Sequence, residues 1–155
     1  MIQIEGHQII KPCSHSLSII GELLRGGPHF KYGVVDNNGR IIIPMSFISI
    51  HEEVGKYFRV RRLSDDKTAL LDMNGNVVID YGQYQVFWSF WGSYIKVRQN
   101  RLYGLLDQNL NIALPCKYSN MFECIDGPHR NCYGIKHNQN DCWHFLDKYT
   151  LRQIQ

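Results

Sequence analysis

Short apolar runs rich in Ile and Val alternate along the chain with clusters of Asn, Asp and Gly. In the stretch YGVVDNNGRIIIP, residues 32–44, two such runs flank the cluster DNNG. Short β-branched runs bounded by turn-forming residues predict β-strands joined by tight turns. The runs GVVD and RIIIP are continuous, which indicates strands buried on both faces or a tightly wrapped sheet. Residues 14–25 have roughly helical apolar spacing, but we favour a strand there too.

The stretch 32–44 recurs three times along the chain. Its counterparts are TALLDMNGNVVID (68–80), YGLLDQNLNIALP (103–115) and WHFLDKYTLRQIQ (143–155). The fifth position of each copy is an aspartate: Asp36, Asp72, Asp107 and Asp147. After each of the first three copies come a connector with an aromatic residue and a further apolar run, which predicts a third strand. We therefore expect units at about 1–30 (degenerate), 31–66, 67–101, 102–141 and 142–155 (partial).

One such unit cannot bury its own apolar face, so neighbouring units must stack against each other. The sequence thus predicts a single all-β domain, residues 1–155, of tandem three-stranded antiparallel β-repeats. About four units and a degenerate N-terminal one would form a propeller-like or barrel-like meander. Whether such a ring closes is left open by the sequence.

The repeated residues resemble those of the bacterial WG-repeat family. Its unit has a Trp-Gly or Tyr-Gly pair, a hydrophobic pair and Asp, then a Gly turn, a Val/Ile run, Pro and a downstream aromatic residue. Tyr32-Gly33 and Tyr103-Gly104 match the opening pair. The first full copy also matches at Asp36, Gly39, Pro44 and Phe47.

The other copies depart from this pattern at single positions. The departures are Thr68-Ala69 and Trp143-His144 at the opening pair, Leu110 at the turn glycine and Asp80 at the proline. The register is kept throughout, and the resemblance covers roughly residues 31–155. It implies tandem β-repeats used as a binding or scaffold surface, with no catalytic residues to transfer.

The composition of the chain limits which binding partners and which cellular compartment are expected. The net charge of +3 is far from the charge density of a dedicated nucleic-acid binder, so we expect a protein partner. No apolar stretch is long enough to span a membrane, and no signal peptide is visible. Five cysteines without C-x-x-C spacing indicate a cytoplasmic protein with reduced thiols.

The four repeated aspartates are interpreted as turn residues. In DNNG and DMNG the Asp begins a tight turn, and its side chain can accept from the backbone N–H two residues on. A catalytic pair has no reason to occur once in every repeat. Because no G-x-S-x-G elbow or phosphate-binding loop is found either, we expect a protein that is not an enzyme.

A second group of polar residues suggests an alternative function. Thiolate and imidazole are zinc ligands, and a hairpin around residues 138–141 would bring His137 opposite Cys142. The candidate metal ligands are Cys132, His137, Cys142 and His144. Their spacing matches no common zinc finger, so a zinc-stabilised or zinc-dependent protein is the alternative rather than the leading hypothesis, and no cofactor is expected.

Two stretches are candidates for contact with a partner. The connector YQVFWSFWGSY (84–94) either fills the core, as Phe47, Ile50, Tyr118 and Met121 would in their copies, or exposes aromatic residues as a binding hot spot. The basic strand YFRVRR is either a solvated face or a contact for an acidic surface. The candidate residues are Phe87, Trp88, Trp91, Tyr94, Arg59, Arg61 and Arg62.

From these observations we expect a non-catalytic protein–protein interaction module. A narrower hypothesis is a stoichiometric inhibitor or a toxin-neutralising immunity protein of bacteria. Neither a membrane nor a nucleic acid is expected as the main partner, and the oligomeric state is left open.

Overall fold

A computed structural model describes residues 8–25, 30–87 and 93–155, and in these ranges the chain consists of strands, turns and loops without a helix. The predicted all-β fold with antiparallel strands in meander order is confirmed. The chain divides into two compact units, Met1–Tyr84 and Gln85–Gln155, which are described separately below. That all residues form a single domain stays a prediction.

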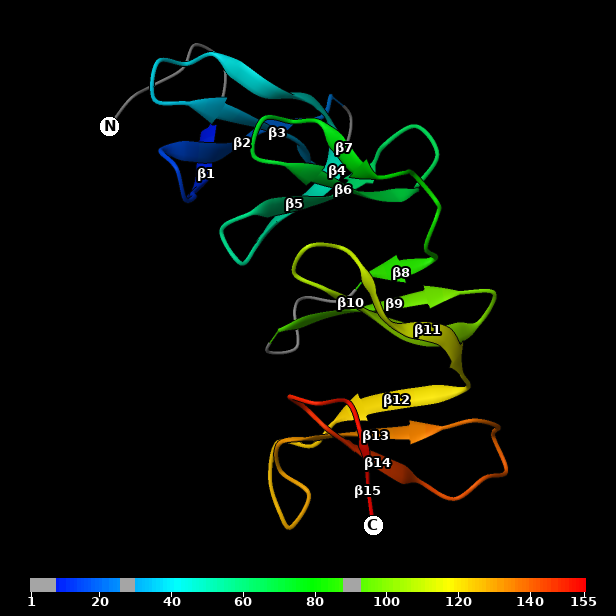
Figure 1. The fold of residues 1–155 in the computed structure, drawn as a ribbon. Helices are drawn as coiled ribbons and strands as arrows, with labels where there is room; N and C mark the ends of the chain where they lie inside the picture. The colour runs from blue at the N-terminus through cyan, green and yellow to red at the C-terminus, as the bar shows by residue number, and fades with distance from the viewer. Residues whose placement is uncertain (1–7, 26–29, 88–92) are drawn as a thin grey trace. The chain divides into compact units, whose positions relative to one another are not determined.

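The first unit is one seven-stranded antiparallel sheet whose strands follow one another in chain order (Figure 1). Its second strand confirms the strand predicted within residues 14–25. Apolar residues from five of the strands, among them Val34, Ile43 and Phe58, form its core. The strands are β1 (Gln8–Pro12), β2 (Leu17–Leu23), β3 (Phe30–Asp36), β4 (Ile41–Glu53), β5 (Tyr57–Arg62), β6 (Thr68–Asp72) and β7 (Val77–Ile79).

The second unit contains two four-stranded antiparallel sheets. One has the order β11-β10-β9-β8 and the other β12-β13-β14-β15. Leu105 and Tyr118 of the first sheet pack with Met121, Tyr133 and Ile135 of the second in one core. The strands are β8 (Val86–Phe87), β9 (Tyr94–Gln99), β10 (Leu102–Asp107), β11 (Ile112–Tyr118), β12 (Asn120–Glu123), β13 (Cys132–Lys136), β14 (His144–Asp147) and β15 (Gln153–Ile154).

The repeated aspartates begin the hairpin turns, as the sequence predicts. The Asp107 carboxylate accepts from the backbone N–H of Asn109 at 2.8 Å and of Asn111 at 2.9 Å. Asp36 and Asp72 accept from the residues two and four positions on in the same way, and Asp147 accepts from Tyr149 and Thr150. These carboxylates satisfy the backbone of their own turns.

Connector residues of all three full repeats lie in the cores of their units. In the first full repeat one continuous strand, β4, forms a hairpin with β3 and then another with β5. In the third repeat the same path is divided between β11 and β12. The connector residues predicted to lie in the core are buried: Phe47, Ile50, Tyr84, Tyr118 and Met121.

Close backbone packing explains the glycine that follows the aromatic residue. A Cβ on Gly33 would lie 2.7 Å from the carbonyl oxygen of Ile43, and one on Gly104 would lie 2.6 Å from that of Leu114. In both copies the register of the hairpin shifts at this point, opposite the stretch that begins with the proline. The second copy has the buried Ala69 at this position, and its β7 ends at Ile79, before Asp80 replaces the proline.

Candidate functional site

The sheet β12–β15 of the second unit has one face in the core and one face outside it. Met121, Tyr133 and Leu146 point into the core. The alternate residues lie on the opposite face. There Phe122 pairs with Gly134, Gly134 with Phe145, and Phe145 with Ile154, so these four residues form one row across all four strands.

Gly134 leaves room for a tightly packed aromatic group. The ring of Phe122 occupies the space in which a side chain at Gly134 would stand. The ring of Trp143 meets Phe122 edge-on at a centroid distance of 4.6 Å, and the Lys136 ammonium lies 4.9 Å above the indole. Such edge-to-face contacts hold aromatic rings in one orientation.

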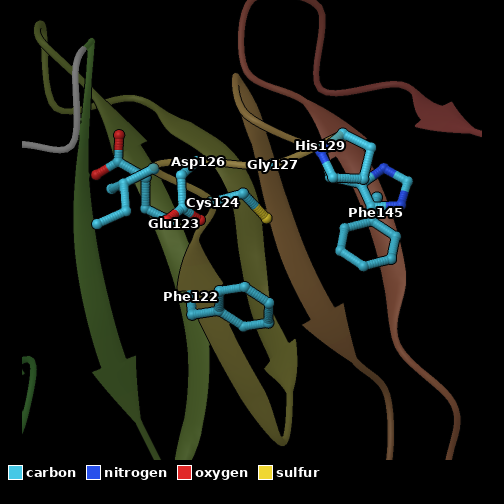
Figure 2. Close-up of a pocket in the computed structure, with 9 residues that line it drawn as sticks. Phe122, Glu123, Cys124, Asp126, Gly127, His129 and Phe145 are labelled. Carbon is cyan, nitrogen blue, oxygen red and sulfur yellow. The ribbon is translucent and has the colours of Figure 1, made fainter.

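The loop between β12 and β13 folds back over this face. The His129 ring stacks on Phe145 at 4.0 Å with an interplanar angle of 10°. Residues of this loop, together with Phe122 and Phe145, line a pocket of about 290 Å³ (Figure 2). The Cys124 sulfur lies on the pocket wall in this view.

Several of these apolar side chains remain in contact with solvent. Phe122 and Trp143 are 38% and 37% exposed, and Ile125 is 82% exposed. We name the residues Phe122, Ile125, His129, Trp143 and Phe145 the aromatic face. Clustered exposed apolar side chains on a folded domain are typical of interaction surfaces.

Charged groups beneath the aromatic face belong to the interior of the unit. Glu123 and Lys148 form a close ion pair between β12 and the turn after β14. Burial, and then the nearby Glu123 carboxylate, raise the pKa of Tyr133. The ammonium of Lys96 donates to the carbonyl oxygen of Met121 at 2.5 Å, and burial lowers its pKa to about 8. These shifts indicate a well-desolvated interior.

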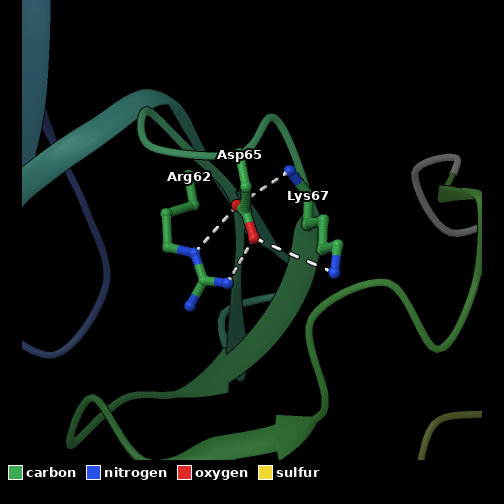
Figure 3. A network of polar contacts seen from close by, with 3 residues as sticks. All are labelled: Arg62, Asp65 and Lys67. Carbon is green, nitrogen blue, oxygen red and sulfur yellow. Dashed lines mark hydrogen bonds and ion pairs between the residues drawn. The ribbon is translucent and has the colours of Figure 1, made fainter.

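The arginines of the predicted basic strand form ion pairs with acidic residues of the first unit. Arg61 forms an ion pair with Asp66 at 2.7 Å, and Arg59 forms one with Glu53 at 3.0 Å. The guanidinium of Arg62 donates twice to Asp65, at 2.9 and 2.6 Å (Figure 3), and lies over the Tyr81 ring. These three arginines therefore do not form an uncompensated positive surface, although their predicted contact with a partner stays a prediction.

The predicted zinc ligands do not converge. Cys132 is buried, whereas His137 and Cys142 are exposed at the end of the β13–β14 hairpin. His137 and His144 are near each other, with 5.9 Å between ring centroids. Within the described ranges, no group of three or more His, Cys, Asp or Glu side chains is placed to hold a metal ion. The alternative of a zinc site on these four residues thus lacks an assembled ligand set.

The structure describes part of the aromatic loop of the second repeat. Trp88 and Trp91 lie outside the described residues, and for Phe87 the structure gives the backbone in β8. Tyr94 is half-buried and contacts the ring of Tyr133 edge-on at 6.2 Å. Its predicted role at a partner surface stays a prediction, as do those of Phe87, Trp88 and Trp91.

Sequence reasoning missed the aromatic face, although a signal was present. Phe122 and Cys124 alternate with the core residue Met121, and Phe145 alternates with Leu146. The alternation alone places an aromatic residue on the face opposite the core.

The hairpin repeats and their buried connectors define an all-β tandem-repeat protein. Comparison with protein families identifies one of the repeats: the model of the WG containing repeat matches residues 32–62. This segment contains β3, β4 and β5, and thus one full unit with Tyr32-Gly33 and the Asp36 turn. No curated protein and no solved structure matches the chain. Among the described residues, no helix has the length and apolar character needed to cross a membrane.

Proposed function

We propose that the protein is a non-catalytic protein-interaction module and that the aromatic face of the second unit contacts the partner. The observation that carries the proposal is the row Phe122–Gly134–Phe145, with Trp143 packed on its end and solvent on its outer side. The WG repeat supports it, since tandem repeats present extended surfaces for binding.

The chemistry of the aromatic face favours a protein partner. The pocket of about 290 Å³ lies at the lower limit for small-molecule sites, which span roughly 300–1,000 Å³. A protruding apolar side chain of another protein suits it better, with Phe122, Trp143 and Phe145 as anchors. Aromatic anchors that are already oriented cost little side-chain entropy on binding, and such residues dominate interface energies.

A narrower form of the proposal is a stoichiometric inhibitor or a toxin-neutralising immunity protein. Such a role requires one stable surface that covers a partner in a fixed ratio. The rigid packing of Trp143 on Phe122 and of His129 on Phe145 supports a surface of this kind. A complex isolated from the source cells should then contain the two chains in equal numbers, as measured by light scattering.

The test of the proposal is affinity capture with paired variants. Phe122→Ala combined with Trp143→Ala should lose a partner that the wild-type protein retains. The matched control is Ile112→Ala, because Ile112 is an exposed apolar residue on β11 of the same unit. Equal capture by the double variant and the wild-type protein, with unchanged thermal unfolding, would exclude the aromatic face. Trp88→Ala with Trp91→Ala tests the connector loop in the same experiment.

A further inference from the structure

Cys124 and Cys132 lie directly across from each other at the neck of the loop that borders the aromatic face. The ladder ends with the pairs Phe122–Gly134 and Glu123–Tyr133, and the next residues in this register are Cys124 and Cys132. The N–H of Cys124 donates to the carbonyl oxygen of Cys132 at 3.0 Å, while the N–H of Cys132 donates to that of His129 in the loop. Directly opposed residues of an antiparallel pair point to the same face of the sheet. The two thiols therefore share one face, the face of Phe122 and Gly134.

The spacing of such a pair suits a disulfide. In hydrogen-bonded antiparallel pairs the Cα atoms are about 5.5 Å apart. A disulfide spans Cα separations of roughly 4.4–6.8 Å. No large movement of the strands is needed to join the two sulfur atoms.

The surroundings of the pair permit chemistry at one thiol. Cys124 and Cys132 are only 8% and 6% exposed, yet Cys124 lines the pocket of the aromatic face, and its sulfur lies on the pocket wall (Figure 2). Burial, and then the neighbouring Cys132 thiol, raise the pKa of Cys124. The second cause agrees with the hydrogen bond that places the two residues opposite each other.

We propose that Cys124 and Cys132 are a dithiol modification site that exchanges with a low-molecular-weight disulfide to form a reversible cross-strand bond. The Cys124 thiolate attacks the small disulfide from the pocket and displaces one half of it as a thiolate. The Cys132 thiolate then attacks the mixed disulfide and displaces the second half. One S–S bond forms in the protein, one breaks in the reagent, and the two thiol protons leave on the two small thiols released.

The bond would fix the loop that carries part of the aromatic face. Residues 125–131 hold Ile125 and His129, and they leave and re-enter the sheet at Cys124 and Cys132. Closing this short loop at its neck removes opening motions of the β12–β13 hairpin. The redox state of the pair thus controls the rigidity of one wall of the pocket, whatever occupies that pocket.

The experiment uses the purified whole chain and glutathione disulfide. After incubation at pH 8 the remaining thiols are alkylated, and the protein is digested with trypsin without reduction. Because Arg130 lies between the two cysteines, cleavage after Lys117, Arg130 and Lys136 separates them. We expect a peptide of residues 118–130 linked to residues 131–136, two hydrogen atoms lighter than the sum of its parts, which disappears on reduction. The exposed Cys142 should take up one glutathione and thereby show that the reagent is active.

Two further measurements test the order of attack. In Cys132→Ser, Cys124 should stop at the mixed disulfide with glutathione, and the linked peptide should be absent. In the wild-type protein the rate should rise about tenfold per pH unit from pH 7 to pH 8, because the raised pKa leaves little thiolate. Full alkylation of Cys124 and Cys132 beside a glutathione-bound Cys142, or a link from Cys132 to another cysteine, would overturn the proposal. A rate independent of pH would overturn Cys124 as the attacking thiol.

Discussion

The ring of Phe122 lies over Gly134, its direct cross-strand partner, so a glycine in β13 makes room for the aromatic face. The same row continues to Phe145 in β14, and Trp143 closes it at one end. Between Phe122 and Phe145, strand β13 contributes only a glycine to this row. The position of the Phe122 ring, and of the Trp143 ring packed on it, thus depends on a residue without a side chain.

Replacing Gly134 with Ala should disturb the aromatic face more than the fold. The new methyl group would meet the end of the Phe122 side chain, which can rotate away, so we expect a loss of about 1 kcal/mol in the free energy of unfolding. The indole N–H resonance of Trp143 should move, because its contact with Phe122 changes. Gly82→Ala is the control: it strains a turn with φ of +76° in the first unit and should leave that resonance in place. An unmoved resonance in Gly134→Ala would show that Phe122 does not depend on Gly134.

A larger loss of stability is expected where the neighbour of the glycine is backbone. A Cβ on Gly104 would lie 2.6 Å from the carbonyl oxygen of Leu114, and one on Gly33 would lie 2.7 Å from that of Ile43. Neither carbonyl can move without breaking the hairpin register, so we expect Gly33→Ala and Gly104→Ala each to cost about 2–3 kcal/mol in urea unfolding. Ala69→Gly tests the same position in the second repeat and should cost only about 1 kcal/mol. Equal losses in the three variants would contradict the close backbone packing.

The turns were predictable from the sequence because their causes are local. The distance from Asp36 to the N–H of Asn38 is fixed by two residues of chain, so the same letters give the same turn in each copy. The burial of the connector residues was predictable for a similar reason. An aromatic residue that recurs at the same position of stacked units is expected to lie in the core of each unit. Leu110, which replaces the turn glycine in the third copy, also fits the turn. It adopts a φ of +68°, close to the +83° of Gly75.

The aromatic face was not predictable in this way, because it depends on pairing between strands. Alternation places Phe122 on the face opposite the core residue Met121, but Gly134 lies beneath its ring only in the observed register of β12 against β13, and a slip by one residue would replace it. The ion pairs of Arg59, Arg61 and Arg62 also required the structure. Asp65 and Asp66 are near Arg62 in the sequence, but which arginine each one meets is decided by the turn between β5 and β6.

The turn aspartates should make stability depend on pH in the acid range. Backbone N–H donors, first that of Asn111, lower the pKa of Asp107, and those of Thr150 and Tyr149 lower the pKa of Asp147. A carboxyl group with a lowered pKa stabilises the fold above its unfolded pKa, near 4, and this contribution is lost as the pH falls through the folded pKa. The urea midpoint of the wild-type protein should therefore fall between pH 5 and pH 2 by more than that of Asp107→Asn. Equal acid dependence would show that the Asp107 charge does not contribute.

Lys96 should give a dependence of the same sign in the alkaline range, with stability rising as the pH rises. Its ammonium is held in the interior of the second unit, on the carbonyl oxygen of Met121 and 4.6 Å from the centroid of the Tyr103 ring. Burial lowers its pKa to about 8, below the usual value of about 10.4, so the unfolded chain binds the proton more tightly than the folded one. The free energy of unfolding should thus gain about 2–3 kcal/mol from this residue as the pH rises from 8 to 10.5.

Tyrosines titrate in the same range, so the measurement is the difference between the wild-type protein and Lys96→Met in urea unfolding at each pH. Lys56→Met, at an exposed residue of the first unit, is the control and should follow the wild-type curve. Parallel curves for the wild-type protein and Lys96→Met would mean that the Lys96 ammonium is solvated in the folded protein.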